Sequence, residues 1–427
     1  MQKGSARNPC TFRPRFVHAP RKDLIMSKIN VVAGCWDMKS SDPSQNGIAI
    51  LSLDYTTGEL TKLCGAYGPH AGTVCVSPNK KTIYVCNEQK NAVNGINGSG
   101  GSVLTYKFDR DSCQLHKVSE LPSYGAFPAF ICTDHTGKYV FVVNHGSYDV
   151  TTHYQCNADG SRTLKRTYDS GCVSMYSTDK DGVICSVSDI KILSGEGSGH
   201  HFETHPNAFK LRFPGLPIFS HLVGQGSPHP HSVNADSHGN VVVCDKGADR
   251  VIVYEIDYEK HNLVERQVFN TYLGCAPRHL AFHPALPFFY IVHEQESSIS
   301  TYSFDRVRKT VTEIQTLGTL PTECNIKNAP ADVRVHPNGQ YVYASNRGHN
   351  SIAVYRINQS DGKIALKHIE RIDAHPRGIN ITPNGAFLIA GDMTGNRILV
   401  FPIGSDGLLD LAHECRDIFS PTSISFL

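Results

Sequence analysis

The chain has 427 residues, with 41 basic and 39 acidic side chains and a formal net charge of +2. This balance gives no reason to expect nucleic acid or an anionic membrane as a partner, and no apolar run approaches the roughly 18 residues of a membrane-spanning helix. The 36 Gly, 23 Pro, 18 Tyr and 19 Phe, without a long Ala/Leu/Glu/Lys-rich block, favour short strands joined by turns over a helical bundle.

The first 26 residues differ from the rest, because they carry six Lys or Arg and a single acidic residue, Asp23. Three prolines in this segment oppose the amphipathic helix that is typical of a transit peptide. We therefore expect residues 1–27 to form a mostly disordered basic extension, with organelle targeting as a minor alternative. Met26 is as good a candidate for the start of translation as Met1.

Fourteen cysteines are present, several of them in or beside apolar runs, where a free cysteine behaves as a small hydrophobe. No two have the CxxC spacing of a zinc site or a redox dithiol. No apolar signal segment is seen. These features predict a cytoplasmic protein with reduced cysteines that uses no metal and no other cofactor.

Internal repeats decide the expected fold. A unit of about fifty residues recurs, consisting of a Pro- or His-containing loop, an apolar strand, a turn such as PNG, a second apolar strand and a third strand ending in Tyr or Phe. Three clear copies, three weaker ones and a worn first copy begin at Ala276, Ala329, His375, Gly68, Phe127, Ser227 and Ile29. An all-strand unit of this period predicts a propeller.

Residues 28–427 are thus expected to form one all-β domain, a seven-bladed β-propeller of four-stranded antiparallel blades. The C-terminal segment SPTSISFL has no copy of its own and is predicted to close the ring by completing the first blade. One interval is doubled, since the equivalent residues Asn144 and Asp245 lie 101 residues apart. Residues 147–226 are therefore expected to hold the outer strands of the third blade and an insertion, either a lid or a disordered loop.

Polar residues recur at two positions of the repeat. The entry of the innermost strand carries His231, Arg278 and Arg377. The exit of the second strand carries Glu88, His145, Lys246, Glu294 and Arg347. Because the strands alternate in direction, both positions lie on one face of the ring. The pattern predicts a small-molecule site at one mouth of the central channel. The residue directly before each of these exit residues is Asn, Asp or His, and Asn346 is one of them. Asn and Asp often cap turns.

From Ser227 onward the motifs are specific. PHPHSV, APRHLAFHP, ASNRGHNSIAVYRI and HPRGINITPNGAFLIAG resemble the seven-bladed propeller lactonase family, which includes bacterial 6-phosphogluconolactonases and fungal 3-carboxy-cis,cis-muconate lactonizing enzymes. The resemblance extends over residues 28–427. In the lactonizing branch, a His, an Arg, a Glu and a second Arg form the suggested site, and they match His231, Arg278, Glu294 and Arg347.

The resemblance implies hydrolysis of an anionic sugar lactone such as 6-phosphogluconolactone. This chemistry needs a base for water, positive charge for the oxyanion and an acid for the leaving alkoxide. We expect these roles to fall to Glu294, Arg278 and His231. The remaining substrate-binding candidates are Arg347, Arg377, Lys246, His145, Glu88 and Asn346.

Two other functions stay open at this stage. The first is a cycloisomerase that closes a carboxymuconate, since the same cations would bind a dicarboxylate. The second is a propeller that binds partners or ligands without catalysis, because a fold alone does not imply chemistry. The single Trp, Trp36, gives little support to an interaction surface rich in aromatic anchors. The sequence does not indicate an oligomeric state.

Overall fold

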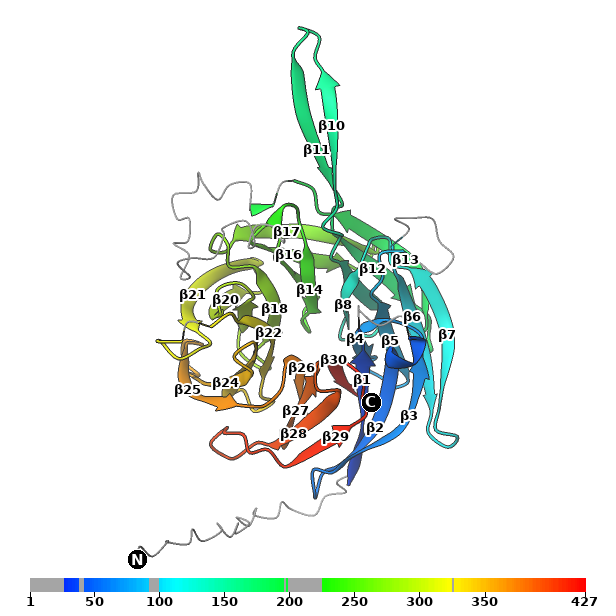
Figure 1. Cartoon of the computed structure of the whole chain (residues 1–427), viewed down its shortest axis with the longest axis vertical. Coiled ribbons are helices and arrows are strands. Elements are labelled where there is room, and N and C mark those ends of the chain that lie inside the picture. Colours follow the sequence, from blue (N-terminus) through cyan, green and yellow to red (C-terminus); the bar gives the residue numbers. More distant parts are fainter. Residues whose placement is uncertain (1–26, 38–41, 92–99, 196, 199–224, 325) are drawn as a thin grey trace, which may run out of the picture.

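A computed structural model describes residues 27–37, 42–91, 100–195, 197–198, 225–324 and 326–427. In these parts the strands form seven four-stranded antiparallel sheets and one two-stranded ribbon. Figure 1 shows the seven sheets arranged as blades around a central axis, which confirms the predicted all-β propeller. None of the described helices has the length and apolar character needed to cross a bilayer.

Each blade has its first strand at the axis and its last strand at the rim. Blades one to three consist, from the axis outward, of β30 (Pro421–Phe426), β1 (Lys28–Cys35), β2 (Gly47–Asp54), β3 (Leu60–Tyr67); β4 (Ala71–Val76), β5 (Thr82–Asn87), β6 (Ser102–Asp109), β7 (Gln114–Pro122); and β8 (Pro128–Thr133), β9 (Tyr139–Asn144), β12 (Cys172–Thr178), β13 (Ile184–Ile192).

The remaining blades have no strand inserted between their members. Blades four to seven consist of β14 (Pro230–Ala235), β15 (Asn240–Asp245), β16 (Arg250–Asp257), β17 (Asn262–Asn270); β18 (Pro277–Phe282), β19 (Phe288–His293), β20 (Ser298–Asp305), β21 (Thr310–Gly318); β22 (Ala329–Val335), β23 (Tyr341–Arg347), β24 (Ser351–Ile357), β25 (Ile364–Arg371); and β26 (Pro376–Ile381), β27 (Phe387–Asp392), β28 (Arg397–Pro402), β29 (His413–Arg416). One short 3-10 helix, η1 (Pro43–Gln45), precedes β2.

The turns explain why the repeat carries Asn-Gly or Thr-Gly between its first two strands. In blade six the Asn338 side chain accepts a hydrogen bond from the backbone N–H of Gln340 at 2.9 Å. Gly339 follows with φ +72°, a left-handed conformation that favours glycine. This turn fixes the register of β22 on β23, and with it the side of the sheet on which each side chain lies.

The core lies between the blades, so neighbouring residues of one strand are buried in different clusters. In β23, Tyr343 packs in a cluster with Leu388 of blade seven, whereas Val342 packs in a cluster with Tyr290 of blade five. All four side chains are fully buried. A strand buried on both faces reads as a continuous apolar run, which accounts for the weak alternation in the sequence.

The ring closes as the sequence predicts. β30 pairs antiparallel with β1, with Val32 opposite Ser425, and forms the innermost strand of blade one. The two ends of the propeller are therefore joined through one sheet. Closure leaves no blade at the ends of the ring with an uncovered face.

Blade three contains extra residues between its second and third strands. Its second strand pairs directly with its third, with Asn144 opposite Cys172. Between these two residues the chain forms a separate ribbon of β10 (Val150–Cys156) and β11 (Arg162–Tyr168), which points away from the propeller (Figure 1). The outer strands β12 and β13 therefore separate the insertion into a part before β12 and a part after β13. His200, His201 and His205, which the sequence places in its second part, lie outside the described residues.

Candidate active site

A β-bulge at the start of each innermost strand shapes the channel mouth. In blade five the register passes from Pro277 opposite His293 to His279 opposite Val292, which leaves Arg278 unpaired. A bulged residue is re-aimed relative to its strand. The bulged residues, here called the entry ring, are Thr422, Gly72, Ala129, His231, Arg278, Ala331 and Arg377. His231, Arg278 and Arg377 are its large polar members, as predicted, and they line a channel cavity of about 340 Å³.

A second ring lies above the first. It is formed, in each second strand, by the residue that follows the partner of the position just before the bulge, as Arg347 follows Asn346, the partner of Pro330. This exit ring consists, in blade order, of Trp36, Glu88, His145, Lys246, Glu294, Arg347 and Met393. The order decides which side chains flank each glutamate. Glu294 lies between the cations Lys246 and Arg347, whereas Glu88 lies between the indole of Trp36 and the imidazole of His145.

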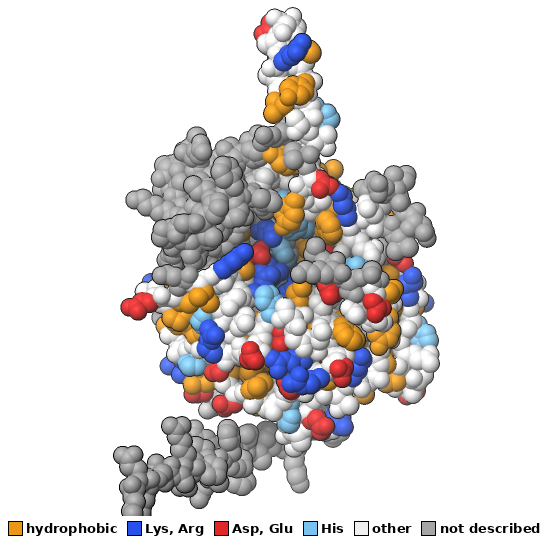
Figure 2. All heavy atoms as spheres, viewed as in Figure 1, with side chains coloured by type: hydrophobic (Ala, Val, Ile, Leu, Met, Phe, Trp, Pro, Cys, Tyr) orange, Lys and Arg blue, Asp and Glu red, His pale blue; other side chains and the backbone are white. Residues whose placement is uncertain are grey.

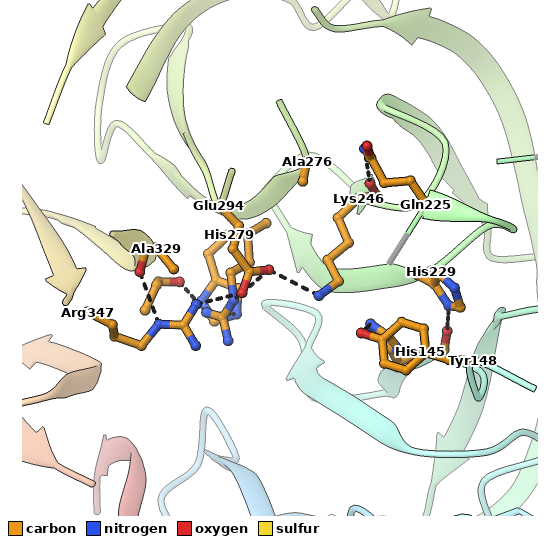
Figure 3. A network of polar contacts seen from close by, with 12 residues as sticks. His145, Tyr148, Gln225, His229, Lys246, Ala276, His279, Glu294, Ala329 and Arg347 are labelled. Atoms are coloured by element: carbon orange, nitrogen blue, oxygen red, sulfur yellow. Dashed lines mark hydrogen bonds and ion pairs between the residues drawn. The ribbon is translucent and has the colours of Figure 1, made fainter. Parts of the chain in front are cut away.

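Glu294 is the anionic centre of one corner of the mouth (Figure 3). Its Oε2 lies 3.0 Å from Nζ of Lys246 and its Oε1 lies 2.7 Å from Nη2 of Arg347. Nε of Arg278 lies 3.7 Å from Oε2, below the carboxylate. Arg347 is held in turn by a 3.1 Å hydrogen bond from its Nε to the carbonyl of Ala329. Three blades therefore place a cation against one carboxylate.

This environment argues against Glu294 as the general base. Burial on its own raises the pKa of a carboxyl group, but Lys246, Arg347 and Arg278 together hold the pKa of Glu294 well below its usual range. A base works best when its pKa lies near the working pH. These contacts favour the anionic form of Glu294, which lies between three cations.

Glu88 forms a second, looser corner with Arg377. Nη2 of Arg377 lies 3.8 Å from Oε2 of Glu88, and its guanidinium stacks on the indole of Trp36 with the central carbon 4.4 Å from the ring centroid. Within the described residues this Oε2 is buried and has no hydrogen-bond partner. It lies directly over Gly72, where an added Cβ would come within 1.8 Å of it.

The protonation of Glu88 is accordingly different. Burial raises the pKa of Glu88 to about 7, and the charges of Arg377, Arg278 and Lys246 only partly oppose this effect. Glu88 was expected to bind substrate. Its environment instead suits a group that gains and loses a proton near neutral pH.

The histidines of the mouth form a neutral wall. His145 stacks on His229 with ring centroids 4.6 Å apart and meets His231 edge-on at 5.6 Å. Burial, followed by the charge of Arg278, lowers the pKa of His231 well below its usual range. Burial and the charge of Lys246 do the same to the pKa of His145. A neutral His231 can donate or accept a hydrogen bond but does not carry the extra proton of a general acid.

Arg278 connects the mouth with the channel. It is only 1 % exposed, and it donates from Nη1 to the carbonyl of Ala331. No partner among the described residues accepts a hydrogen bond from its Nε. Burial and the nearby charge of Arg347 lower the pKa of Arg278 to about 9, so it stays cationic at neutral pH. A buried cation with a donor to spare is stabilised by an incoming anion.

The structure does not bring Asn346 to the mouth. Its side chain is fully buried, donates to the carbonyl of Thr319 at 2.9 Å and accepts from the Thr319 hydroxyl at 2.8 Å. Asp245 and Asp392, at the same position of other blades, accept from backbone N–H groups of His229 and His375. These residues hold the loop before the innermost strand through hydrogen bonds, which is the capping role that Asn and Asp favour. Asn346 therefore does not contribute its side chain to the mouth.

Four contributors were missed by the sequence reasoning. Trp36 and Gly72 occupy the two ring positions in blades one and two, so the repeat alignment could have found them. Tyr148, 53 % exposed, and His229 lie against His145, with ring centroids 5.3 and 4.6 Å away. Their places depend on loop paths that the repeat does not specify.

The mouth as a whole carries excess positive charge. Lys246, Arg278, Arg347 and Arg377 face two carboxyl groups, Glu294 and Glu88, and burial raises the pKa of Glu88 to about 7. Figure 2 shows basic, acidic and histidine side chains gathered in a hollow near the centre of this face. Among the described residues, no group of three or more His, Cys, Asp or Glu is placed to hold a metal ion. The arrangement can bind an anion, stabilise a developing oxyanion and accept a proton.

Comparisons with known proteins identify the family of the chain. A family model described as "Lactonase, 7-bladed beta-propeller" matches residues 31–426. A 6-phosphogluconolactonase of Bacillus subtilis is 25 % identical over 75 % of this chain and 85 % of its own length. One from Pectobacterium atrosepticum is 29 % identical over 77 % and 80 %. The structure of a periplasmic gluconolactonase from Pseudomonas aeruginosa superposes with a TM-score of 0.74 at 21 % identity, covering 94 % of this chain and 99 % of that one, a likeness of fold.

Proposed function

Because the chain belongs to the seven-bladed β-propeller lactonase family, we propose that it hydrolyses a sugar lactone that carries an anionic group, with 6-phosphogluconolactone as the leading candidate. The observation that supports this substrate class is the excess of cations at the mouth. Lys246, Arg278 and Arg347 already surround Glu294, and Arg377 stands at the opposite corner. An uncharged lactone would leave this excess charge without a partner.

In this proposal the cations have two different roles, oxyanion stabilisation and binding of the substrate's anionic group. Arg278, at the entry ring, stabilises the oxyanion that develops on the lactone carbonyl, since its buried Nε has no hydrogen-bond partner among the described residues and lies 3.7 Å from Oε2 of Glu294. Arg347, Arg377 and Lys246 hold the phosphate or carboxylate of the substrate, a task that suits the fork geometry of arginine. Glu294 keeps Lys246 and Arg347 in place. His231 offers a hydrogen bond to the lactone ring from its Nδ1 side, which has no partner among the described residues.

Cyclisation of a carboxymuconate would use the same anion-binding groups, so no feature of the mouth favours it separately. The named relatives that match most of the chain are lactonases. Hydrolysis is therefore the function we carry forward.

The test compares a charged with an uncharged substrate. Freshly generated 6-phosphogluconolactone and δ-gluconolactone are followed by acid release against their spontaneous hydrolysis. A charge-assisted arginine contact is worth about 1.5–3 kcal/mol, or roughly 10- to 100-fold. We expect at least this preference in kcat/KM for the phosphorylated lactone, and Arg347→Ala should remove most of it.

Arg308→Ala is the matched control, because that arginine is 81 % exposed in a turn after β20. It should leave both rates unchanged. Equal turnover of the two lactones by the unmodified protein would contradict the assignment of an anionic substrate. No acceleration of either lactone would contradict hydrolysis itself.

A further inference from the structure

Hydrolysis at this mouth requires a group that accepts a proton from water, and the geometry leaves Glu294 unsuited to it. Both oxygens of Glu294 are engaged, at 2.7 Å by Arg347 and at 3.0 Å by Lys246. Protonation of this carboxylate would set three cations against one another without a counter-charge. A proton acceptor must therefore come from elsewhere in the two rings.

Resting on the proposed function, we propose that Glu88 is the catalytic base: its carboxylate takes a proton from the attacking water and returns that proton to the ring oxygen of the opened lactone. Glu88 follows β5 at the same exit position that Glu294 holds after β19. It therefore faces the same mouth from the other side of the ring.

The local fold gives Glu88 room that its neighbours do not have. The entry-ring residue of its own blade is Gly72, and a Cβ there would lie 1.8 Å from Oε2 and 2.9 Å from Cδ of Glu88. Gly72 also lines the channel cavity together with Arg278 and His231. The missing side chain thus leaves room for the Glu88 carboxyl over Gly72, which belongs to the wall of the same cavity that Arg278 lines.

The contacts of Glu88 allow it to exist in both protonation states. Arg377 approaches only to 3.8 Å and is also held by Trp36. The backbone N–H of Glu88 is fixed by the carbonyl of His70 at 2.8 Å, so the residue itself is held in place. Oε2 is buried and has no hydrogen-bond donor among the described residues to hold the carboxyl in its anionic form.

The charged groups around Glu88 come from three other elements. Arg377 belongs to β26, Arg278 to β18, and Lys246 follows β15, while the buried thiol of Cys86 precedes Glu88 on β5. Burial outweighs the three cations and raises the pKa of Glu88 to about 7. A carboxyl group with a pKa near 7 is about half deprotonated at neutral pH, so it can accept a proton from water and return it within the same turnover.

The steps balance without another reactant. The oxygen of water forms a bond to the lactone carbonyl carbon while its proton passes to Glu88, and the oxyanion forms beside Arg278. The bond from the carbonyl carbon to the ring oxygen then breaks, and protonated Glu88 delivers its proton to that oxygen. The product hydroxy acid loses its acidic proton to solvent, and Glu88 is again a carboxylate.

The experiment measures the pH dependence of lactone hydrolysis for three proteins. In the unmodified protein, kcat/KM should rise with pH through an apparent pKa near 7, because the base must be deprotonated. Glu88→Gln should lower kcat by about 100- to 10,000-fold, the usual contribution of a general base, and should abolish this rise. KM should change by less than about threefold, since the anion-binding cations remain.

Gly72→Ala gives an independent variant that keeps the carboxyl but displaces it. It should lower kcat at least tenfold while the binding of 6-phosphogluconate is retained. Glu59→Gln, in the turn before β3, and Gly318→Ala, whose added Cβ would meet only the carbonyl of Leu320 at 3.7 Å, are the controls and should behave as the unmodified protein.

The outcomes separate the two proposals. If the unmodified protein hydrolyses the lactone and Glu88→Gln keeps both its kcat and its pH profile, the inference about Glu88 is wrong and the proposed function stands. A Glu88→Gln variant that loses affinity for 6-phosphogluconate in proportion to its loss of rate would make Glu88 a binding residue and also overturn the inference. If the unmodified protein accelerates no lactone, both proposals fall.

Discussion

The two glutamates of the exit ring occupy the same position in different blades, and their surroundings give them opposite properties. Glu294 has Lys246 and Arg347 as ring neighbours and is held as an anion. Glu88 has Trp36 and His145 as ring neighbours, and burial raises its pKa to about 7. In a propeller, a position on one blade sets where a side chain points, whereas the adjacent blades decide its chemistry. A repeat fold can thereby build a fixed anion and a proton acceptor from one structural element.

The largest effect is expected on stability, when Glu294 is replaced. Glu294→Gln leaves Lys246, Arg278 and Arg347 close together without their shared anion. Removing one partner of a buried ion pair costs about 3–5 kcal/mol, so the free energy of unfolding at pH 7 should fall by that amount. Denaturant unfolding measures it, and added phosphate should restore part of the loss by binding the cations. A change equal to that of Glu88→Gln would contradict the distinction between the two corners.

A second test uses the pH dependence of stability. In the unfolded chain a glutamate has a pKa of about 4.3, whereas burial raises the pKa of Glu88 in the folded protein to about 7. Between these values the folded state keeps a proton that the unfolded state has released, so the free energy of unfolding falls as pH rises. The fall amounts to roughly 4 kcal/mol and is complete above pH 7.

Glu88→Gln should remove this fall, which denaturant unfolding at pH 5 and pH 8 would reveal as a smaller difference between the two conditions. Glu294 has the opposite sign, since its lowered pKa gives stability that is lost only as pH falls below the usual range of a carboxyl. The same pH dependence in Glu88→Gln and in the unmodified protein would show that Glu88 is not the group responsible.

A third prediction concerns Arg278, whose charge acts on both glutamates. Lysine has a lower intrinsic pKa than arginine, and in the same buried position Arg278→Lys should lose much of its charge at neutral pH. Loss of an oxyanion donor lowers kcat by about 100-fold or more, and steady-state kinetics at pH 7 should show this loss with little change in KM. An unchanged kcat would remove Arg278 from the reaction.

Much of this arrangement could be predicted from the sequence, because it follows from the repeat. The turn residues fix the register of each blade, so His231, Arg278 and Arg377 could be placed on one ring and Glu294 and Arg347 on another. The protonation of these groups could not be predicted, since it depends on contacts between blades far apart in the chain. The expectation that Glu294 is the base therefore took no account of its contacts with Lys246 and Arg347.

Other misses have local causes. Asn346 directly precedes Arg347, and the sequence alone could not show that its amide turns to Thr319 instead of to the channel. Tyr148 reaches the mouth because the ribbon of β10 and β11 leaves the blade just after it, an insertion that has no counterpart in the other repeats. The likeness to known lactonases likewise could not indicate which carboxyl carries a proton.

The smallest effect should come from removing the ribbon. An unchanged activity would show that the difference between Glu88 and Glu294 depends on the two rings alone. Val150 and Tyr168 are paired at the base of the ribbon, so an Asn-Gly turn can replace residues 151–167 in a two-residue hairpin. Stability should change by less than about 0.5 kcal/mol, and kcat/KM should stay the same. A loss of more than tenfold in kcat/KM would instead make the ribbon part of the substrate site.

The most direct measurement of the central claim is the titration of the two carboxyl groups themselves. Infrared difference spectra of the unmodified protein against Glu88→Gln, and against Glu294→Gln, isolate the band of each protonated carboxyl between pH 4 and pH 9. Glu88 should lose its band near pH 7, and Glu294 should show no protonated band in this range. A Glu88 that is already ionised at pH 5, or a Glu294 that titrates near neutrality, would contradict the division of roles between them.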